Sequence, residues 1–358
     1  MINPHFFKDK RILVTGHTGF KGGWLSIWLQ MMGAKVTGFS LDPKDQEGIF
    51  NVSGIKDLIH DVRGDIRDFD ILNQAFQEGK PEIVFHLAAQ ALVIDSYNNP
   101  LETFETNVQG TANVLEAIRQ CDSVKSAVII TTDKCYENQE WVYGYRETDP
   151  MGGHDPYSAS KGAAELVISS YQRSFFNQPD SPGIASARAG NVIGGGDWSN
   201  NRLVPDIFRA LKSNEVVNVR NPNATRPWQH VLEPLGAYLL LSQKLYFDKK
   251  QFSSAWNIGP FSKDVYTVKQ VIEEILKNTK KGYWVDSSNP KQLHEANLLM
   301  LDISKAFKFL GWRPTLDFTS TVRMTSDWYM MNEDADVLLF SKNQINEYLK
   351  LWNLLKVD

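Results

Sequence analysis

The run RILVTGHTGFKG at residues 11–22 decides the fold, because it joins a strand pattern directly to a glycine-rich turn. Residues 11–15 are apolar and β-branched, the spacing GxxGxxG follows, and residues 24–32 continue with helical apolar spacing. The glycines allow a tight turn, and the first turn of the helix offers free N–H groups to a pyrophosphate. In this context the run predicts a dinucleotide site made by Gly16, Thr18, Gly19, Phe20, Lys21 and Gly22.

The alternation of strands and helices continues through the first half of the chain. Strand patterns lie at residues 35–39 and 83–87, another ends at 65–66, and the apolar run 126–131 fits a strand buried on both faces. This order predicts an α/β fold with a doubly wound parallel (Rossmann) sheet in residues 1–190. Beyond it the pattern loosens. We therefore expect residues 191–358 to form a smaller mixed α/β substrate lobe, with some chain returning to the first domain.

Composition narrows the classes of function. The chain has 358 residues, a net charge of -4 and 42% hydrophobic residues, which suits a sizeable core but gives no basic excess for nucleic acid. The N-terminal residues lack a signal-peptide pattern, and no apolar run has the length to span a membrane. Cys121 and Cys135 are too few for a disulfide framework and lack metal-ligand spacing. These features predict a soluble cytoplasmic protein with no metal, nucleic-acid or membrane partner.

A tyrosine and a lysine four residues apart form the first candidate for chemistry. Tyr157 and Lys161 share one helix face in the pattern YxxxK. A phenol has an ordinary pKa near 10, and we expect a neighbouring ammonium and a cationic nicotinamide to lower the pKa of Tyr157. Tyr157 then takes the proton of a substrate hydroxyl as hydride leaves the same carbon. The plain alternative is a surface helix pair, since YxxxK also occurs by chance.

A second polar group follows the predicted strand at 126–131. Thr132, Asp133 and Lys134 lie at the carboxyl end of that strand, where doubly wound sheets place their chemistry. Asp133 and Lys134 offer an acid and a base beyond those that oxidation of a hydroxyl requires. The plain alternative is a strand-end turn with a solvated ion pair.

Together these motifs resemble the extended short-chain dehydrogenase/reductase family, and within it the sugar-nucleotide 4,6-dehydratases. The GxxGxxG turn, the Thr-Asp-Lys run and YxxxK carry the likeness, which spans essentially the whole chain. The sequence departs from the usual dehydratase dipeptide Asp-Glu by carrying Lys134. The resemblance implies that Thr132 assists Tyr157, and that Lys161 also holds the nicotinamide ribose.

The same resemblance implies further contacts with the two ligands. We expect Asp65 and Ile66 to contact adenine, and Arg226 to grip the substrate diphosphate with a guanidinium suited to bidentate bonds. The remaining cofactor residues implied are Leu87, Ala88, Ala89, Gln90 and Asn107. The remaining substrate residues implied are Asn191, Trp198, Arg202 and Arg220.

The end of the second strand bears on the choice of cofactor. Asp42 lies at about the right distance along the chain for a ribose hydroxyl, and no arginine stands next to it for a 2′-phosphate. This pattern favours NAD over NADP. Ser40 is the competing candidate for the same ribose contact.

The implied reaction is loss of water from a nucleotide sugar. Tyr157 deprotonates the C4 hydroxyl while NAD accepts hydride, Lys134 as free amine removes the C5 proton, and protonated Asp133 delivers a proton to the departing C6 hydroxyl before hydride returns to C6. The runs at 15–29, 131–136 and 220–231 are most similar to the branch that acts on CDP-glucose. That branch feeds dideoxysugar synthesis for lipopolysaccharide O-antigen.

Three other functions stay open on the sequence. One is a 4,6-dehydratase of UDP-N-acetylglucosamine or dTDP-glucose. Another is a sugar-nucleotide 4-epimerase, which does not need the pair Asp133 and Lys134. The third is an NAD(H)-binding regulatory protein, which would be expected to have lost Tyr157 or Lys161. The resemblance also implies a homodimer or homotetramer, with the helical patterns at 103–119 and 157–175 as candidate interface helices.

Overall fold

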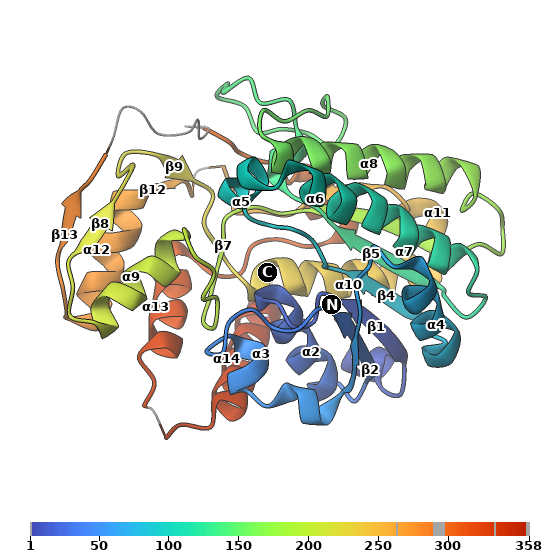
Figure 1. Ribbon diagram of the computed structural model, residues 1–358, viewed down its shortest axis with the longest axis horizontal. Helices are drawn as coiled ribbons and strands as arrows, with labels where there is room; N and C mark the ends of the chain where they lie inside the picture. Colours follow the sequence, from blue (N-terminus) through green and yellow to red (C-terminus); the bar gives the residue numbers. More distant parts are fainter. Residues whose placement is uncertain (1, 263, 289–297, 333, 356–358) are drawn as a thin grey trace.

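The computed structural model describes residues 2–262, 264–288, 298–332 and 334–355, and its centre is a sheet of seven parallel strands (Figure 1). The strand order is β11-β6-β5-β4-β1-β2-β3, so the winding reverses between β1 and β4. The predicted doubly wound α/β fold is confirmed. The strands are β1 (Arg11–Thr15), β2 (Lys35–Ser40), β3 (His60–Arg63), β4 (Ile83–His86), β5 (Ser126–Ile130), β6 (Gly183–Arg188) and β11 (Ala255–Asn257).

Helices cover both faces of this sheet, because successive side chains of each strand point to opposite faces. On β1, Leu13 joins one apolar core while Ile12 and Val14 join the other. The first core packs under α4 (Phe69–Gly79), α7 (Gly110–Arg119) and α8 (Pro156–Ser174). The second packs under α2 (Phe20–Met31), α10 (Leu232–Phe247) and α14 (Val337–Leu354).

The helical pattern expected at 103–119 is part of a longer run of three helical pieces. These are α6 (Pro100–Phe104), the π-helical turn η2 (Glu105–Gln109) and α7, and the backbone stays right-handed helical across both junctions. A short helix, α5 (Val93–Asn98), precedes them. π-Turns often occur at functional sites, and this one carries Asn107 beside the end of β4.

The second half of the chain builds a smaller lobe of helices and short strand pairs, on the left in Figure 1. It also returns chain to the sheet, since β11 pairs with the edge strand β6. The lobe helices are α9 (Leu203–Lys212), α12 (Val268–Thr279) and α13 (Phe318–Tyr329). The strand pairs are β7 (Val192–Ile193) with β10 (Gln229–His230), β8 (Val217–Val219) with β13 (Trp284–Asp286), and β9 (Thr225–Arg226) with β12 (Tyr266–Thr267).

The remaining elements are short and connect the larger ones. They are α1 (Pro4–Phe7), α3 (Ile49–Val52), α11 (Lys249–Phe252), η1 (Ile55–Leu58), η3 (Asp133–Cys135) and η4 (Ala306–Leu310). Among the described residues, no helix combines the length and apolarity needed to cross a bilayer. Within the same ranges, no group of three or more His, Cys, Asp or Glu side chains is arranged to hold a metal ion.

Candidate active site

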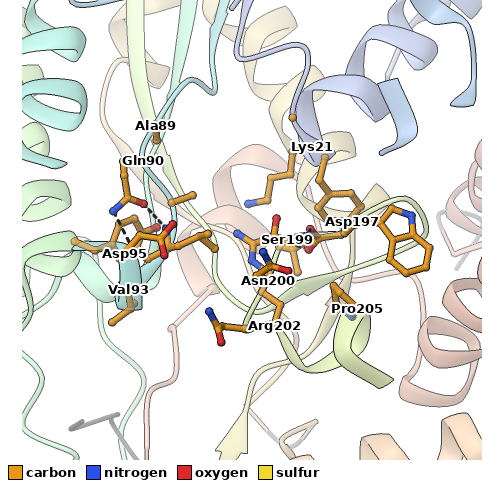
Figure 2. A pocket seen from close by; sticks show the side chains of 18 of the residues that line it. Lys21, Ala89, Gln90, Val93, Asp95, Asp197, Ser199, Asn200, Arg202 and Pro205 are labelled. Carbon is orange, nitrogen blue, oxygen red and sulfur yellow. Dashed lines mark hydrogen bonds and ion pairs between the residues drawn. The ribbon is translucent and has the colours of Figure 1, made fainter. Parts of the chain in front are cut away.

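One large cavity of about 1420 Å³ opens at the carboxyl ends of the sheet strands, where the winding reverses between β1 and β4. Its lining combines the glycine-rich turn, the ends of β2, β4 and β5, and lobe residues at 191–207 and 217–228. Figure 2 shows Gln90 and Asp95 on one side and Lys21 and Arg202 on the other. Pockets for one small ligand measure roughly 300–1,000 Å³. This cavity therefore has room for two ligands side by side.

The glycine-rich turn is shaped for close approach of backbone to a ligand. Gly16 has a φ of +76°, and a Cβ built on it would lie 2.6 Å from the Ala88 nitrogen. A Cβ on Gly22 would lie 2.1 Å from the Gly16 oxygen. Helix α2 begins at Phe20, so its unpaired N–H groups and positive dipole end face the cavity. These features fit the pyrophosphate of a dinucleotide.

The adenosine end of the predicted cofactor site contains an unexpected arginine. Ser40 is nearly buried and its hydroxyl forms a 2.9 Å hydrogen bond with that of Thr18, whereas the Asp42 side chain is 89% exposed. Arg63 lies 3.6 Å from Asp42, because the parallel register of β2 and β3 aligns Ser40 with Arg63. No arginine stands next to Asp42 in the sequence, as expected. In the folded structure, however, Arg63 lies beside Asp42, so the expectation that no arginine is near is wrong there. The Arg63 guanidinium is already engaged by Asp61, at 2.7 Å.

The predicted base and its lysine lie together on α8, as their spacing requires. Tyr157 and Lys161 both line the cavity, and the Lys161 ammonium donates to the Ile130 carbonyl at 3.3 Å. Burial raises the pKa of Tyr157 to about 12, while a hydrogen bond from Thr132 acts in the lowering direction. Burial lowers the pKa of Lys161 to about 8, and the nearby charge of Glu165 opposes that shift. The expected lowering of the Tyr157 pKa by Lys161 is therefore wrong for the protein itself, because burial of the phenol dominates.

The Thr132–Lys134 turn brings the proposed acid and base into the same cavity. Asp133 is 1% exposed, and its Oδ1 accepts a hydrogen bond from the Thr132 hydroxyl at 3.0 Å. Its Oδ2 is buried with no hydrogen-bond partner among the described residues. Lys134 is half-buried and lines the cavity beside it. The side chains of Asp133 and Lys134 form no ion pair with each other in the described structure, so this turn is not a solvated ion pair.

A buried carboxylate behind this turn was not predicted from the sequence. Glu165 lies one helical turn beyond Lys161 and accepts hydrogen bonds from Thr131 at 2.5 Å, Ser186 at 2.8 Å and Arg188 at 2.7 Å. The Glu165 and Arg188 side chains are only 4% and 5% exposed. The pair therefore fixes α8, β5 and β6 to one another beneath the catalytic side chains. The i, i+4 step from Lys161 to Glu165 was the available signal.

The predicted substrate residues line the lobe side of the cavity, and they differ in burial and in hydrogen bonding. Asn191 has a left-handed φ of +49°, a conformation that asparagine adopts more readily than most residues. Arg202 donates to Asp197 at 2.7 Å, while exposed Arg220 and half-buried Arg226 donate to backbone carbonyls at 3.4 and 2.8 Å. Asp197 lies in the Gly-rich loop at 194–201 and was not predicted as a site residue.

Two predicted contacts take other roles. Trp198 lies at the cavity edge but is only 6% exposed, with its ring packed edge-on against Tyr329 at 5.0 Å. Asn107 does not line the cavity. Its side chain donates to the Gln90 carbonyl and Ser160 hydroxyl, and accepts from the Gln90 nitrogen, each at 2.9 Å. The amide of Asn107 therefore holds the loop after β4 against α8, which is a structural role beside the predicted cofactor site.

All the other predicted site residues line this one cavity. On the cofactor side they are Gly16, Thr18, Gly19, Phe20, Lys21, Gly22, Ser40, Asp42, Asp65, Ile66, Leu87, Ala88, Ala89 and Gln90. On the reaction and substrate side they are Thr132, Asp133, Lys134, Tyr157, Lys161, Asn191, Arg202, Arg220 and Arg226. Lys21 belongs to the cofactor side but also feels the charge of Arg202 on the substrate side. Burial and that charge lower the pKa of Lys21 to about 8.

Comparison with known proteins defines the class. The family model described as GDP-mannose 4,6 dehydratase matches residues 13–325, so the chain belongs to this family of sugar-nucleotide dehydratases. CDP-glucose 4,6-dehydratase of Salmonella typhimurium is 48% identical over 356 residues, which are 98% of this chain and 99% of the relative. The dTDP-D-glucose 4,6-dehydratase of Homo sapiens is 25% identical over 336 residues, 90% and 91% of the two chains. The resemblance to sugar-nucleotide 4,6-dehydratases is thus confirmed.

Solved structures support the same fold. An epimerase of Methanothermobacter thermautotrophicus superposes with a TM-score of 0.81 at 23% identity, covering 95% of this chain and 96% of the other. The dTDP-glucose 4,6-dehydratase of Bacillus anthracis, solved in complex with NAD, gives 0.74 at 22% identity, covering 90% and 97%. The UDP-glucose 4-epimerase of Thermus thermophilus, also complexed with NAD, gives 0.74 at 27% identity, covering 89% and 98%.

Proposed function

We propose that this protein is an NAD-dependent dehydratase that converts CDP-D-glucose to CDP-4-keto-6-deoxy-D-glucose and water. One observation carries the proposal. A buried carboxylate with an unpaired oxygen, Asp133, and a lysine, Lys134, share a cavity with Tyr157, Lys161 and a dinucleotide turn. An epimerase has no use for that additional acid and base. The relative at 48% identity supports CDP-glucose as the substrate.

The residues on the cofactor side fit NAD. The Gly16–Gly22 turn and the start of α2 would hold the pyrophosphate, Ser40 or Asp42 the adenosine ribose, and Asp65 and Ile66 the adenine side. NAD supplies the hydride acceptor for C4 and the hydride donor for C6. Gln90 is fixed by Asn107 and by bonds to Thr103 and Leu92, so the loop after β4 is preorganised next to this site.

Tyr157 acts on the first proton. As phenolate it accepts the proton of the C4 hydroxyl, and the neighbouring Thr132 hydroxyl, which donates to Asp133 in this structure, can turn to stabilise that phenolate. Lys161 places a positive charge in the same buried region when it is protonated. Glu165 favours that charge from one turn further along α8. The oxidation step therefore depends on side chains held by a single helix and the end of β5.

Asp133 and Lys134 act on the elimination. The 4-ketone makes the C5 proton acidic, and Lys134 as free amine removes it. Asp133 in its protonated form gives a proton to the C6 hydroxyl, which departs as water. Its Oδ2 has no hydrogen-bond partner among the described residues, so the carboxyl group keeps one oxygen that no neighbour uses. Afterwards the Lys134 ammonium returns a proton to C5. The proton that Tyr157 took from the C4 hydroxyl passes to the Asp133 carboxylate, so all three groups are restored in each turnover.

The surface of the helical layer supports self-association. Leu101 and Leu166 are 77% and 62% exposed, and Phe104 is 39% exposed. They lie on α6 and α8, whose neighbouring positions Figure 1 shows at the top of the molecule. We propose that these helices pair in a homodimer or homotetramer. We also propose that the enzyme works in the cytoplasm, in the synthesis of dideoxysugars for lipopolysaccharide O-antigen. A change to Leu166→Glu should shift the sedimentation coefficient to that of a smaller species.

The first experiment is incubation of the purified protein with NAD and CDP-glucose, followed by mass spectrometry of the nucleotide sugar. The expected result is loss of one water without net formation of NADH. Tyr157→Phe, which keeps the ring but removes the base, should lower kcat by about 10³-fold. Turnover of dTDP-glucose or UDP-N-acetylglucosamine in place of CDP-glucose would overturn the substrate assignment. An isomer formed without loss of water would overturn the dehydratase assignment.

A further inference from the structure

The Asp133 carboxylate lies directly against a glycine from another strand end. Gly190 follows β6, and a Cβ built on it would lie 1.9 Å from Asp133 Oδ2, 2.0 Å from Cγ and 2.2 Å from Oδ1. These three atoms are the nearest neighbours of that position. The φ of Gly190 lies outside the left-handed region, so its backbone is one that alanine adopts freely. The glycine is therefore required for space, not for backbone conformation.

Hydrogen bonds hold both partners of this contact. The Gly190 carbonyl accepts a 3.0 Å hydrogen bond from the side chain of Gln229, which is 3% exposed. The Asn191 carbonyl accepts a bond from the Gln229 nitrogen at 3.2 Å. Asp133 is held on its other side, where Oδ1 accepts from Thr132. A methyl group at position 190 must therefore displace the carboxylate.

We propose that Gly190 is a positioning residue for Asp133, and that the contact fixes the orientation of the carboxyl group that protonates the C6 hydroxyl. The inference rests on the proposed function. In the step concerned, the C6–O bond breaks, Asp133 gives its proton to the leaving oxygen, and water and an Asp133 carboxylate result. Gly190 thus controls elimination and not C4 oxidation, because Tyr157 and Lys161 are carried by α8 and are not among its nearest neighbours.

The test is Gly190→Ala in the full-length enzyme with NAD and CDP-glucose. Displacing an acid by about 1 Å costs roughly 100-fold, so kcat for water loss should fall about 100-fold. C4 oxidation should stay within a few-fold of the unchanged protein. The 4-keto intermediate and reduced cofactor should therefore accumulate, measured by the near-ultraviolet absorbance of NADH after rapid mixing.

A double-mutant cycle separates this effect from general disruption. In an Asp133→Ala background the space is already open, so adding Gly190→Ala should change kcat less than about threefold. The double variant also serves if the single one folds poorly, because it removes the overlap. Gly236→Ala is the matched control: its Cβ would lie 2.3 Å from the Trp352 ring, in a helix contact away from the cavity. That variant should lower stability without accumulation of NADH.

Three outcomes would overturn the inference. They are a kcat for Gly190→Ala within about threefold of the unchanged enzyme, an equal loss of oxidation and elimination, or an undiminished effect in the Asp133→Ala background. Failure of the proposed function is distinguishable from all three. It would appear as the absence of a 4-keto-6-deoxy product from the unchanged enzyme, whatever residue occupies position 190.

Discussion

The two walls of the cavity differ in how deeply their charged side chains are buried. In the wall formed by the sheet and α8, the ion pair of Glu165 and Arg188 is buried, with both side chains at most 5% exposed. In the lobe wall, Arg220 is exposed and Arg226 half-buried, and both donate to backbone carbonyls. Reacting groups need fixed geometry, whereas long cationic side chains can bind a diphosphate from a solvated surface. The residues proposed for the reaction and those proposed to bind the substrate diphosphate therefore lie in separate halves of the chain.

The largest expected effect comes from a substitution in the wall formed by the sheet and α8. Replacing Arg188 with Met leaves Glu165 buried without its cation, which should lower the free energy of unfolding by about 3–5 kcal/mol. Urea denaturation measures it. Adding Glu165→Gln to that variant removes the uncompensated charge and should recover part of the loss. A loss below about 1 kcal/mol in the single variant would mean that this wall is no more firmly built than the lobe.

The next effect is the loss of folding stability at acidic pH, compared between a histidine of the sheet and a histidine of the lobe. His86 of β4 and His230 of β10 are buried, and burial lowers the pKa of each from 6.5 to about 3. The unfolded chain takes up these protons below pH 6.5 while the folded chain does not. Stability from both groups is thus present above pH 6.5 and lost as pH falls toward 3. At pH 5 each should cost about 2 kcal/mol.

Denaturation curves at pH 7 and pH 5 measure this loss, with His86→Gln and His230→Gln as the matched variants. Each substitution should remove about half of the difference between the two pH values. His86 has both ring nitrogens hydrogen-bonded, to Thr15 and Thr111, whereas Nε2 of His230 has no hydrogen-bond partner among the described residues. A pH dependence unchanged in both variants would assign the acid sensitivity to other groups.

A smaller effect sharpens the description of the lobe wall. Arg226→Ala should raise the KM for CDP-glucose roughly 10–30-fold, since a hydrogen bond to a charged group contributes about 1.5–2 kcal/mol. The kcat should change less than threefold, because the role proposed for Arg226 is to bind the diphosphate and not to take part in the reaction. Arg220→Ala is the comparison and should raise KM less than fivefold, because its side chain is exposed. Equal effects on kcat and KM at Arg226 would contradict this division of labour.

The smallest effect concerns the adenosine end. Asp42 is highly exposed and its contact with Arg63 is solvated, so Asp42→Ala should change kcat/KM for NAD less than about fivefold. The same change frees one side of Arg63 and should increase the use of NADP. Steady-state kinetics with both cofactors test this, with Asp42→Ala/Arg63→Ala as the control that should lose the gain. Unchanged use of NADP would show that Asp61 alone holds Arg63.

Features encoded by local pattern were predictable from the sequence. The Gly16–Gly22 turn, the face shared by Tyr157 and Lys161, and the turn at Thr132–Lys134 each depend on spacing within one element. Contacts between elements were not. Arg63 approaches Asp42 through the register of β2 and β3, and Glu165 meets Arg188 across α8 and β6. The spacing of residues within one element does not predict such contacts between elements.

Two predicted residues have neighbours that the sequence did not indicate. Residue type reports what a side chain is able to do, not what surrounds it. The ring of Trp198 lines the cavity and also packs on Tyr329, and the amide of Asn107 bonds to Gln90 and Ser160. The contact between Gly190 and Asp133 was missed for the reverse reason, because a glycine without positive φ gives no sign of what fills the space beside it.

The late strand β11 has a consequence for synthesis on the ribosome. It pairs with β6, but Ala255 follows Arg188 by 67 residues (255 − 188), so β6 has no neighbour on that side when it emerges. At about 5–20 residues per second, the nascent chain exposes this edge for roughly 3 to 13 s. An unpaired strand edge is a template for wrong pairing with another chain. Translation pauses between residues 188 and 255 should therefore lower the yield of folded enzyme in a way that pauses after 257 do not.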